Sequence, residues 1–75
     1  MRENKARNRW MLESENAIVK ARPELKGKFN MLRIWDDLLY LYTCNGITPA
    51  IASERILKSE NLKKQCDLFG IVPLS

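Results

Sequence analysis

The side chains that most enzymes use for acid–base chemistry are sparse in this sequence. Its 75 residues include no histidine, so a histidine-based general acid, general base or nucleophile-activating pair cannot be built. Asp36 and Asp37 are the one adjacent carboxylate pair, and neighbouring helix positions diverge by about 100°, so they cannot converge on one substrate. Two cysteines, Cys44 and Cys66, are too few for a Cys-only metal site. We therefore expect no enzyme, no metal and no cofactor.

Contact with nucleic acid is a second kind of chemistry, and residues 48–66, TPAIASERILKSENLKKQC, are suited to it. Their pattern predicts two short helices with a corner near residues 58–59, as in a helix-turn-helix, whose second helix exposes polar side chains to base edges. Amide and ammonium groups on the second helix suit bases and phosphates, and two cations of the first could flank a phosphate. The candidates are Asn61, Lys63, Lys64 and Gln65 on the second helix and Arg55 and Lys58 on the first.

The match to a helix-turn-helix has two faults. No glycine occupies the turn, and Glu54 stands where the motif usually has a small apolar residue. Glu60 and Asp67, on the second predicted helix, also repel phosphate. Two packed helices without a reading role are the competing interpretation, and we expect the corner to be chiefly structural.

The N-terminal segment MRENKARNRW is a second basic region, in which four cations stand against the single carboxylate of Glu3. The cations are Arg2, Lys5, Arg7 and Arg9. As a helix start or as a flexible arm, this segment could lie on a phosphate backbone or in an acidic groove of a protein. The alternative is a solvated helix start. Because arginine near a helix N-terminus opposes the helix dipole, local stability does not explain these residues, which favours a binding role.

Leu12 and Val19 form a short apolar strip outside the main apolar arc of the first predicted helix. Two apolar residues in line could be a dimer seam or a docking strip for another protein. Alternatively, a loop or the C-terminal tail, with Ile71, Val72 and Leu74, covers them. Both interpretations stay open.

The elements that must position these residues are predicted to be four helices. The first, over residues 4–21, stops before Pro23, because a residue before proline is biased out of the helical region. Its apolar arc, with Ser14 at the edge, consists of Ala6, Trp10, Met11, Ala17, Ile18 and Ala21. The second helix, about residues 28–44, is apolar over half its surface and should be the central strut. Whether it begins at Pro23 or after Gly27 stays open.

The third and fourth helices are predicted mainly from their ends. Thr48 and Pro49 suit the N-cap and first position of the third helix, and Ser59 suits the N-cap of a fourth over residues 60–69. The fourth helix should bury the stripe Leu62, Cys66 and Phe69, and Gly70 should end it.

Composition limits the function classes further. A formal charge of +4 attracts phosphate backbones, anionic membranes or acidic proteins without choosing among them. Two cysteines do not make the disulfide framework of a small secreted domain, and no signal peptide or membrane-spanning run is apparent. We expect a cytoplasmic protein with reduced thiols and no membrane partner.

The sequence thus predicts a single all-α domain over residues 1–75, a compact bundle of about four helices with a corner between the last two. We expect a small regulatory protein that acts by binding. One hypothesis is a nucleic-acid-associated domain that binds DNA or regulates transcription. The other is a small inhibitor or adaptor, of the kind that mobile elements and phages encode, docking on a larger host protein complex through the apolar strip and the basic arm. Such a chain could also form a homodimer.

Overall fold

The computed structural model describes the chain from residue 2 to residue 72, and its side chains from residue 5 onward. Within this range the chain contains no strand. It forms the helices α1 (Arg2–Ala21), α2 (Ile34–Thr43), α3 (Pro49–Leu57) and α4 (Glu60–Phe69) and the short 3₁₀ turn η1 (Pro23–Leu25). The prediction of a small all-α bundle of four helices is therefore confirmed.

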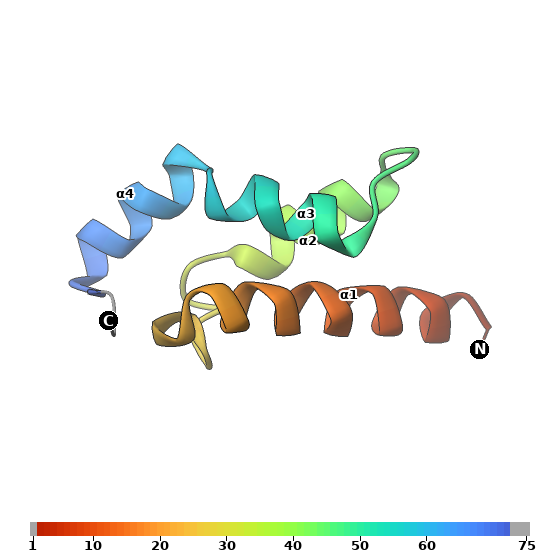
Figure 1. Cartoon of the computed structure of the whole chain (residues 1–75), viewed down its shortest axis with the longest axis horizontal. Helices are drawn as coiled ribbons and strands as arrows, with labels where there is room; N and C mark the ends of the chain where they lie inside the picture. Colours follow the sequence, from red (N-terminus) through yellow and green to blue (C-terminus); the bar gives the residue numbers. More distant parts are fainter. Residues whose placement is uncertain (1, 73–75) are drawn as a thin grey trace.

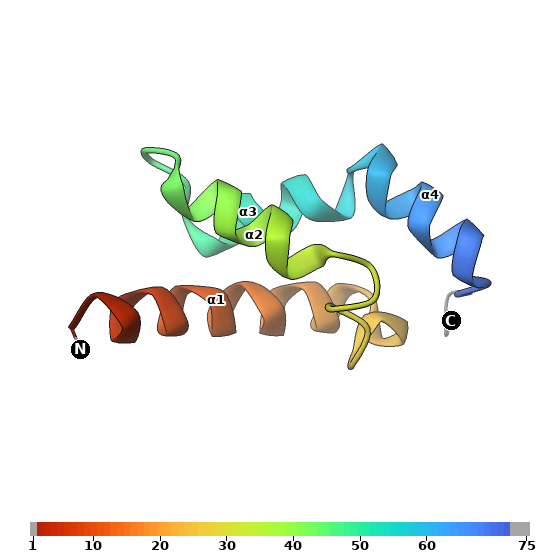
Figure 2. The ribbon, with the colours of Figure 1, turned by 180° about the vertical axis from the view of Figure 1, so that it is seen from behind.

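Helix α1 forms one long side of the molecule, and α2 and α3 pack against it and against each other (Figure 1, Figure 2). A helix of 20 residues is about 30 Å long, which is most of the 38 Å length of the molecule. Helix α4 turns away from α3 and extends past the C-terminal end of α1 (Figure 1). The start of α1 and the end of α4 therefore lie at opposite ends of the long axis.

The hydrophobic core takes side chains from all four helices and from the connection between α1 and α2. Its members are Ile18, Leu25, Phe29, Leu32, Ile34, Leu38, Leu41, Ala52, Ile56, Leu62 and Cys66. Trp10 lies at its edge, where its Nε1–H donates a hydrogen bond to the Ile47 carbonyl oxygen, 3.1 Å away. This bond ties α1 to the loop before α3.

The buried face of α1 differs from the predicted arc at small residues. Ala6 and Ala21 are exposed, whereas Ser14, predicted at the edge of the arc, is fully buried. The Ser14 hydroxyl donates to the Trp10 carbonyl oxygen at 2.9 Å, so its burial leaves no unsatisfied polar group. Small buried side chains, Ser14 on α1 and Ala52 on α3, allow a close approach of these two helices.

The second helix is shorter than predicted, which corrects the range 28–44. It begins at Ile34, because Arg33 adopts a left-handed backbone conformation (φ 59°) through which an α-helix does not continue. Residues 28–33 form turns, in which the Ile34 N–H donates to the Phe29 carbonyl oxygen at 2.9 Å. Phe29 and Leu32 are buried nonetheless. A compact turn buries such residues as well as a helix does, so their apolar character does not show where the helix begins.

The corner between α3 and α4 lies where the sequence predicts it. The Thr48 hydroxyl oxygen accepts a hydrogen bond from the Ile51 N–H at 3.3 Å, and Pro49 is the first residue of α3. Ser59 is the N-cap residue of α4, but its side chain makes no capping hydrogen bond. Helix α4 then spans the predicted residues 60–69.

The end of α4 is closed by Gly70, whose φ of 69° is left-handed. The Ile71 N–H donates to the Cys66 carbonyl oxygen at 2.9 Å, the bond expected beside a glycine C-cap. Phe69 is a correction, because it was expected in the buried stripe but is 46% exposed. The last turn of α4 lies beyond the end of α1 (Figure 1), so that α1 does not cover it.

Candidate nucleic-acid interface

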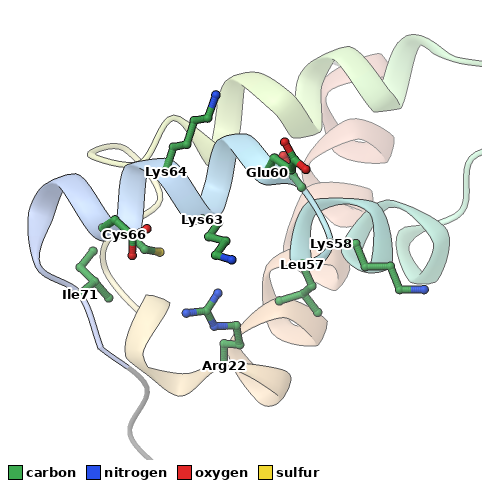
Figure 3. Close-up of a pocket in the computed structure, with 10 residues that line it drawn as sticks. Arg22, Leu57, Lys58, Glu60, Lys63, Lys64, Cys66 and Ile71 are labelled. Atoms are coloured by element: carbon green, nitrogen blue, oxygen red, sulfur yellow. The ribbon is translucent and has the colours of Figure 1, made fainter.

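The adjacent lysines of α4 point in different directions. Lys63 and Lys64 are both exposed on α4, and successive helix positions diverge by about 100°. Figure 3 shows the Lys63 ammonium directed into a cleft beside α4 and the Lys64 ammonium directed away from it. Both lysines line the cleft, but Lys63 is the one whose ammonium is directed into it.

The cleft lies between the C-terminal end of α1, the end of α3 and one side of α4, and encloses about 710 Å³. It is lined by Arg22, Leu57, Lys58, Ser59, Glu60, Lys63, Lys64, Cys66, Asp67 and Ile71. Arg22 and Lys63, far apart in the sequence, point toward one another across it (Figure 3). Two cationic groups directed into the same space attract an anion such as the phosphate of a nucleic acid.

Arg22 is held in its position by a buried carboxylate. Its Nε–H donates to Glu24 Oε2 at 2.6 Å, and the two side chains are 28% and 5% exposed. A guanidinium carries five N–H donors, of which this contact uses the one on Nε. The terminal nitrogens of Arg22 are directed toward Lys63 (Figure 3), where they could donate to a ligand.

A second cleft at the C-terminal end of α4 brings further cations to this end of the molecule. It is lined by Pro23, Glu24, Lys26, Lys28, Met31, Phe69, Gly70, Ile71 and Val72. Cations outnumber carboxylates six to three along the two clefts together. We call these six cations the basic end: Arg22, Lys26, Lys28, Lys58, Lys63 and Lys64.

Sequence reasoning missed Arg22, Lys26 and Lys28 as binding candidates. They belong to the end of α1 and the connection that follows it, far in sequence from the lysines of α4. A signal was present, because residues 20–28, KARPELKGK, carry four cations against one carboxylate. Such a charge run marks a candidate surface, but only the fold places it beside α4.

The corner residues predicted to read DNA do not converge on one surface. The Lys58 Nζ donates to Glu54 Oε1 at 2.7 Å, and this hydrogen bond and the charge of Lys58 lower the pKa of Glu54. Figure 3 shows Lys58 pointing away from the cleft. Arg55 and Asn61 line a different groove together with residues of α2, and Gln65 is half-buried. The candidate residues of the corner thus lie along more than one groove, which does not favour a shared reading surface on the second corner helix.

The N-terminal cations lie in the first turns of α1, at the end of the molecule opposite α4 (Figure 1). Lys5 is exposed and Arg7 is half-buried. Arg9 Nε lies 3.8 Å from Glu13 Oε1, and both side chains are largely exposed. The side chain of Arg2 lies outside the described residues. These cations therefore cannot share one compact site with the basic end.

The apolar strip predicted on α1 is only partly exposed. Leu12 is 55% exposed, but Val19 is half-buried and packs against the core, so that of the two residues only Leu12 is largely open to a partner. Leu12 belongs instead to a groove between α1 and α2, rimmed by Arg7, Asn8 and Glu15. We call its apolar members the apolar groove: Met11, Leu12, Trp35 and Leu39. Of the predicted covering tail, Ile71 packs on the core and Val72 is exposed, and Leu74 lies outside the described residues.

The remaining reactive side chains form no further site in the part of the chain that the structure describes. Cys66 is buried and Cys44 is half-buried, and both are free thiols. No group of three or more metal-ligating side chains occurs among the described residues. None of the helices described has both the length and the hydropathy needed to cross a membrane.

Comparison of the chain with protein-family models, with curated proteins and with solved structures found no match. Interpretation of its function therefore depends on the geometry of its own surfaces.

Proposed function

We propose that this chain is a non-enzymatic regulatory protein that associates with nucleic acid by binding the phosphate backbone at its basic end. The observation that carries the proposal is the shared cleft of Arg22 and Lys63, whose cationic groups point toward one another (Figure 3). Binding of a phosphate there releases the counterions condensed on the nucleic acid, which favours association. The surplus of cations over carboxylates at the basic end supports the same partner.

The proposed contact is with the backbone rather than with the bases. Base reading requires several polar side chains on one exposed helix face, whereas Lys63 and Lys64 of α4 diverge (Figure 3). Glu60 and Asp67 line the same cleft and repel phosphate, so the proposed contact is confined to the space between Arg22 and Lys63. We therefore propose that the protein regulates transcription or other uses of DNA by occupying the duplex. A cytoplasmic location is part of the same proposal.

Equilibrium binding to random-sequence duplex DNA over a range of salt concentrations tests this proposal. We expect wild-type affinity to fall steeply as salt rises. Lys63→Ala should weaken binding and reduce the slope of log K against log salt by about one, the contribution of one phosphate contact. Lys64→Ala is the matched comparison: it removes the same charge from the neighbouring position, and its effect should be clearly smaller because the Lys64 ammonium is directed away from the cleft (Figure 3).

Two outcomes contradict the proposal. Failure of the wild-type protein to bind duplex DNA at low salt would exclude a phosphate-binding function and turn attention to protein partners. An effect of Lys64→Ala equal to or larger than that of Lys63→Ala would show that the outer face of α4, not the cleft, contacts the nucleic acid.

A further inference from the structure

The apolar groove is a surface that nucleic-acid binding at the basic end does not use. Met11 of α1 and Trp35 of α2 are half-buried within it, while Leu12 and Leu39 are 55% and 39% exposed. Two exposed leucines on adjacent helices, rimmed by polar residues, are typical of a contact surface.

Opposite charges of α1 lie at the two ends of this groove. Arg7 lies four residues before Met11, and Glu15 lies four residues after it, about 6 Å away along the helix in each direction. Both residues line the groove. Among the side chains that the structure describes, neither Arg7 nor Glu15 forms an ion pair, whereas the outward-facing Arg9 pairs with Glu13. Within the described side chains, the groove thus has a cation without an ion-pair partner at one end and such a carboxylate at the other.

We infer that the groove binds a second copy of this chain, through antiparallel pairing of the two α1 helices about a two-fold axis near Met11 and Leu12. Each Leu12 then enters the groove of the other copy, and each Arg7 lies beside Glu15 of the other copy. A two-fold axis requires a self-complementary surface, and opposite charges at equal distances from the centre provide one. Parallel pairing places Arg7 against Arg7 and is disfavoured by like-charge repulsion.

The expected dimer is weak. Stable complexes bury about 800 Å² per partner, which is roughly a seventh of the 5595 Å² surface of this chain. The apolar groove supplies only the centre of such an interface. We therefore expect a monomer–dimer equilibrium that shifts with protein concentration between the micromolar and millimolar ranges.

Antiparallel pairing also fixes the distance between the two basic ends. From Leu12 to Arg22 the rise along α1 is about 15 Å, so the two copies of Arg22 lie roughly 30 Å apart. This distance is close to one turn of duplex DNA, about 34 Å, so both clefts could meet the same side of one duplex. This consequence rests on the proposed function, but the dimer itself does not.

Sedimentation equilibrium of the purified full chain without nucleic acid tests the dimer. The wild-type protein should dimerise as its concentration rises, and Leu12→Asp should remain monomeric, because a carboxylate would have to be desolvated in the contact. Leu68→Asp is the matched control: Leu68 is 75% exposed on α4, outside the groove, and its replacement should leave dimerisation unchanged. Circular dichroism melting verifies that both variants fold, as expected for exposed positions.

Charge reversal tests the antiparallel orientation. Arg7→Glu or Glu15→Arg alone should weaken dimerisation about ten-fold or more, and the double variant should restore it. A wild-type protein that stays monomeric to millimolar concentration overturns the inference and leaves the groove to a different protein. Loss of the dimer in Leu68→Asp, or no restoration in the double variant, also overturns it. None of these results depends on DNA binding, so failure of the dimer and failure of the proposed function are distinguishable.

Discussion

At the scale of single residues, Arg22 serves both the fold and the proposed interface. Its Nε–H donates to Glu24, whose side chain is only 5% exposed, while the terminal nitrogens are directed to the cleft (Figure 3). Burial of a carboxylate is costly unless a charged or hydrogen-bonding partner accompanies it. Lys63 is exposed on α4, and among the described residues it forms no ion pair with a buried group.

Arg22 and Lys63 should therefore differ in their effect on stability. Arg22→Ala removes a charged partner of buried Glu24 and should lower the free energy of unfolding by about 1–3 kcal/mol. Lys63→Ala should change it by no more than about 0.5 kcal/mol. Urea denaturation of both variants measures the difference. Equal stabilities would show that the pair with Glu24 does not hold Arg22 in place.

At the scale of the helices, the starts of α3 and α4 are fixed by different means. Helix α3 begins with a side-chain cap from Thr48 and a proline at its first position. Ser59, the N-cap residue of α4, makes no capping hydrogen bond with its side chain. Helix α4 is fixed instead by buried Leu62 and by the glycine that ends it. The start of α3 thus depends on a local hydrogen bond, whereas the start of α4 depends on packing.

This difference predicts unequal effects of two similar substitutions. Thr48→Ala should destabilise the protein by about 0.5–2 kcal/mol, because the Ile51 N–H loses its partner. Ser59→Ala, at the equivalent position of α4, should cost clearly less. Thermal or urea unfolding of both variants measures this, and a larger loss for Ser59→Ala would contradict the assignment of the caps.

At the scale of the whole molecule, two candidate surfaces lie on different parts of a small, elongated bundle. The apolar groove lies along α1 and α2, and the basic end lies around α4, beyond the C-terminal end of α1 (Figure 1). Distant sites without shared partners usually respond independently to mutation. One core supports both surfaces, and a chain of 75 residues has little stability in reserve.

In helix α2, a buried leucine of the core and a partly exposed leucine are adjacent. Leu38 is fully buried, and Leu38→Ala should cost about 2–5 kcal/mol, enough to unfold a marginal domain. Leu39→Ala, on the same helix at a 39% exposed position, should cost much less and should mainly weaken the dimer. The melting temperatures of the two variants measure the contrast. An unchanged melting temperature for Leu38→Ala would show that this face of α2 is not the core.

The sequence by itself determined the all-α class, the start of α3 at Thr48 and Pro49, and the range of α4 with its glycine end. These features depend on interactions within one helical turn, such as caps, proline geometry and the left-handed glycine, so that neighbouring residues suffice to predict them. Burial of Leu62 and Cys66 followed from the helical spacing of apolar residues.

The tertiary structure alone decided the rest. Arg33 is left-handed although its neighbours favour a helix, Val19 packs inward, and Phe69 is partly exposed. The cleft of Arg22 and Lys63 joins the end of α1 to α4, which no local pattern connects. Each of these features depends on which distant segments meet in space. Local sequence signals act over a few residues, whereas packing of the whole core decides which helix faces are covered and which charges become neighbours.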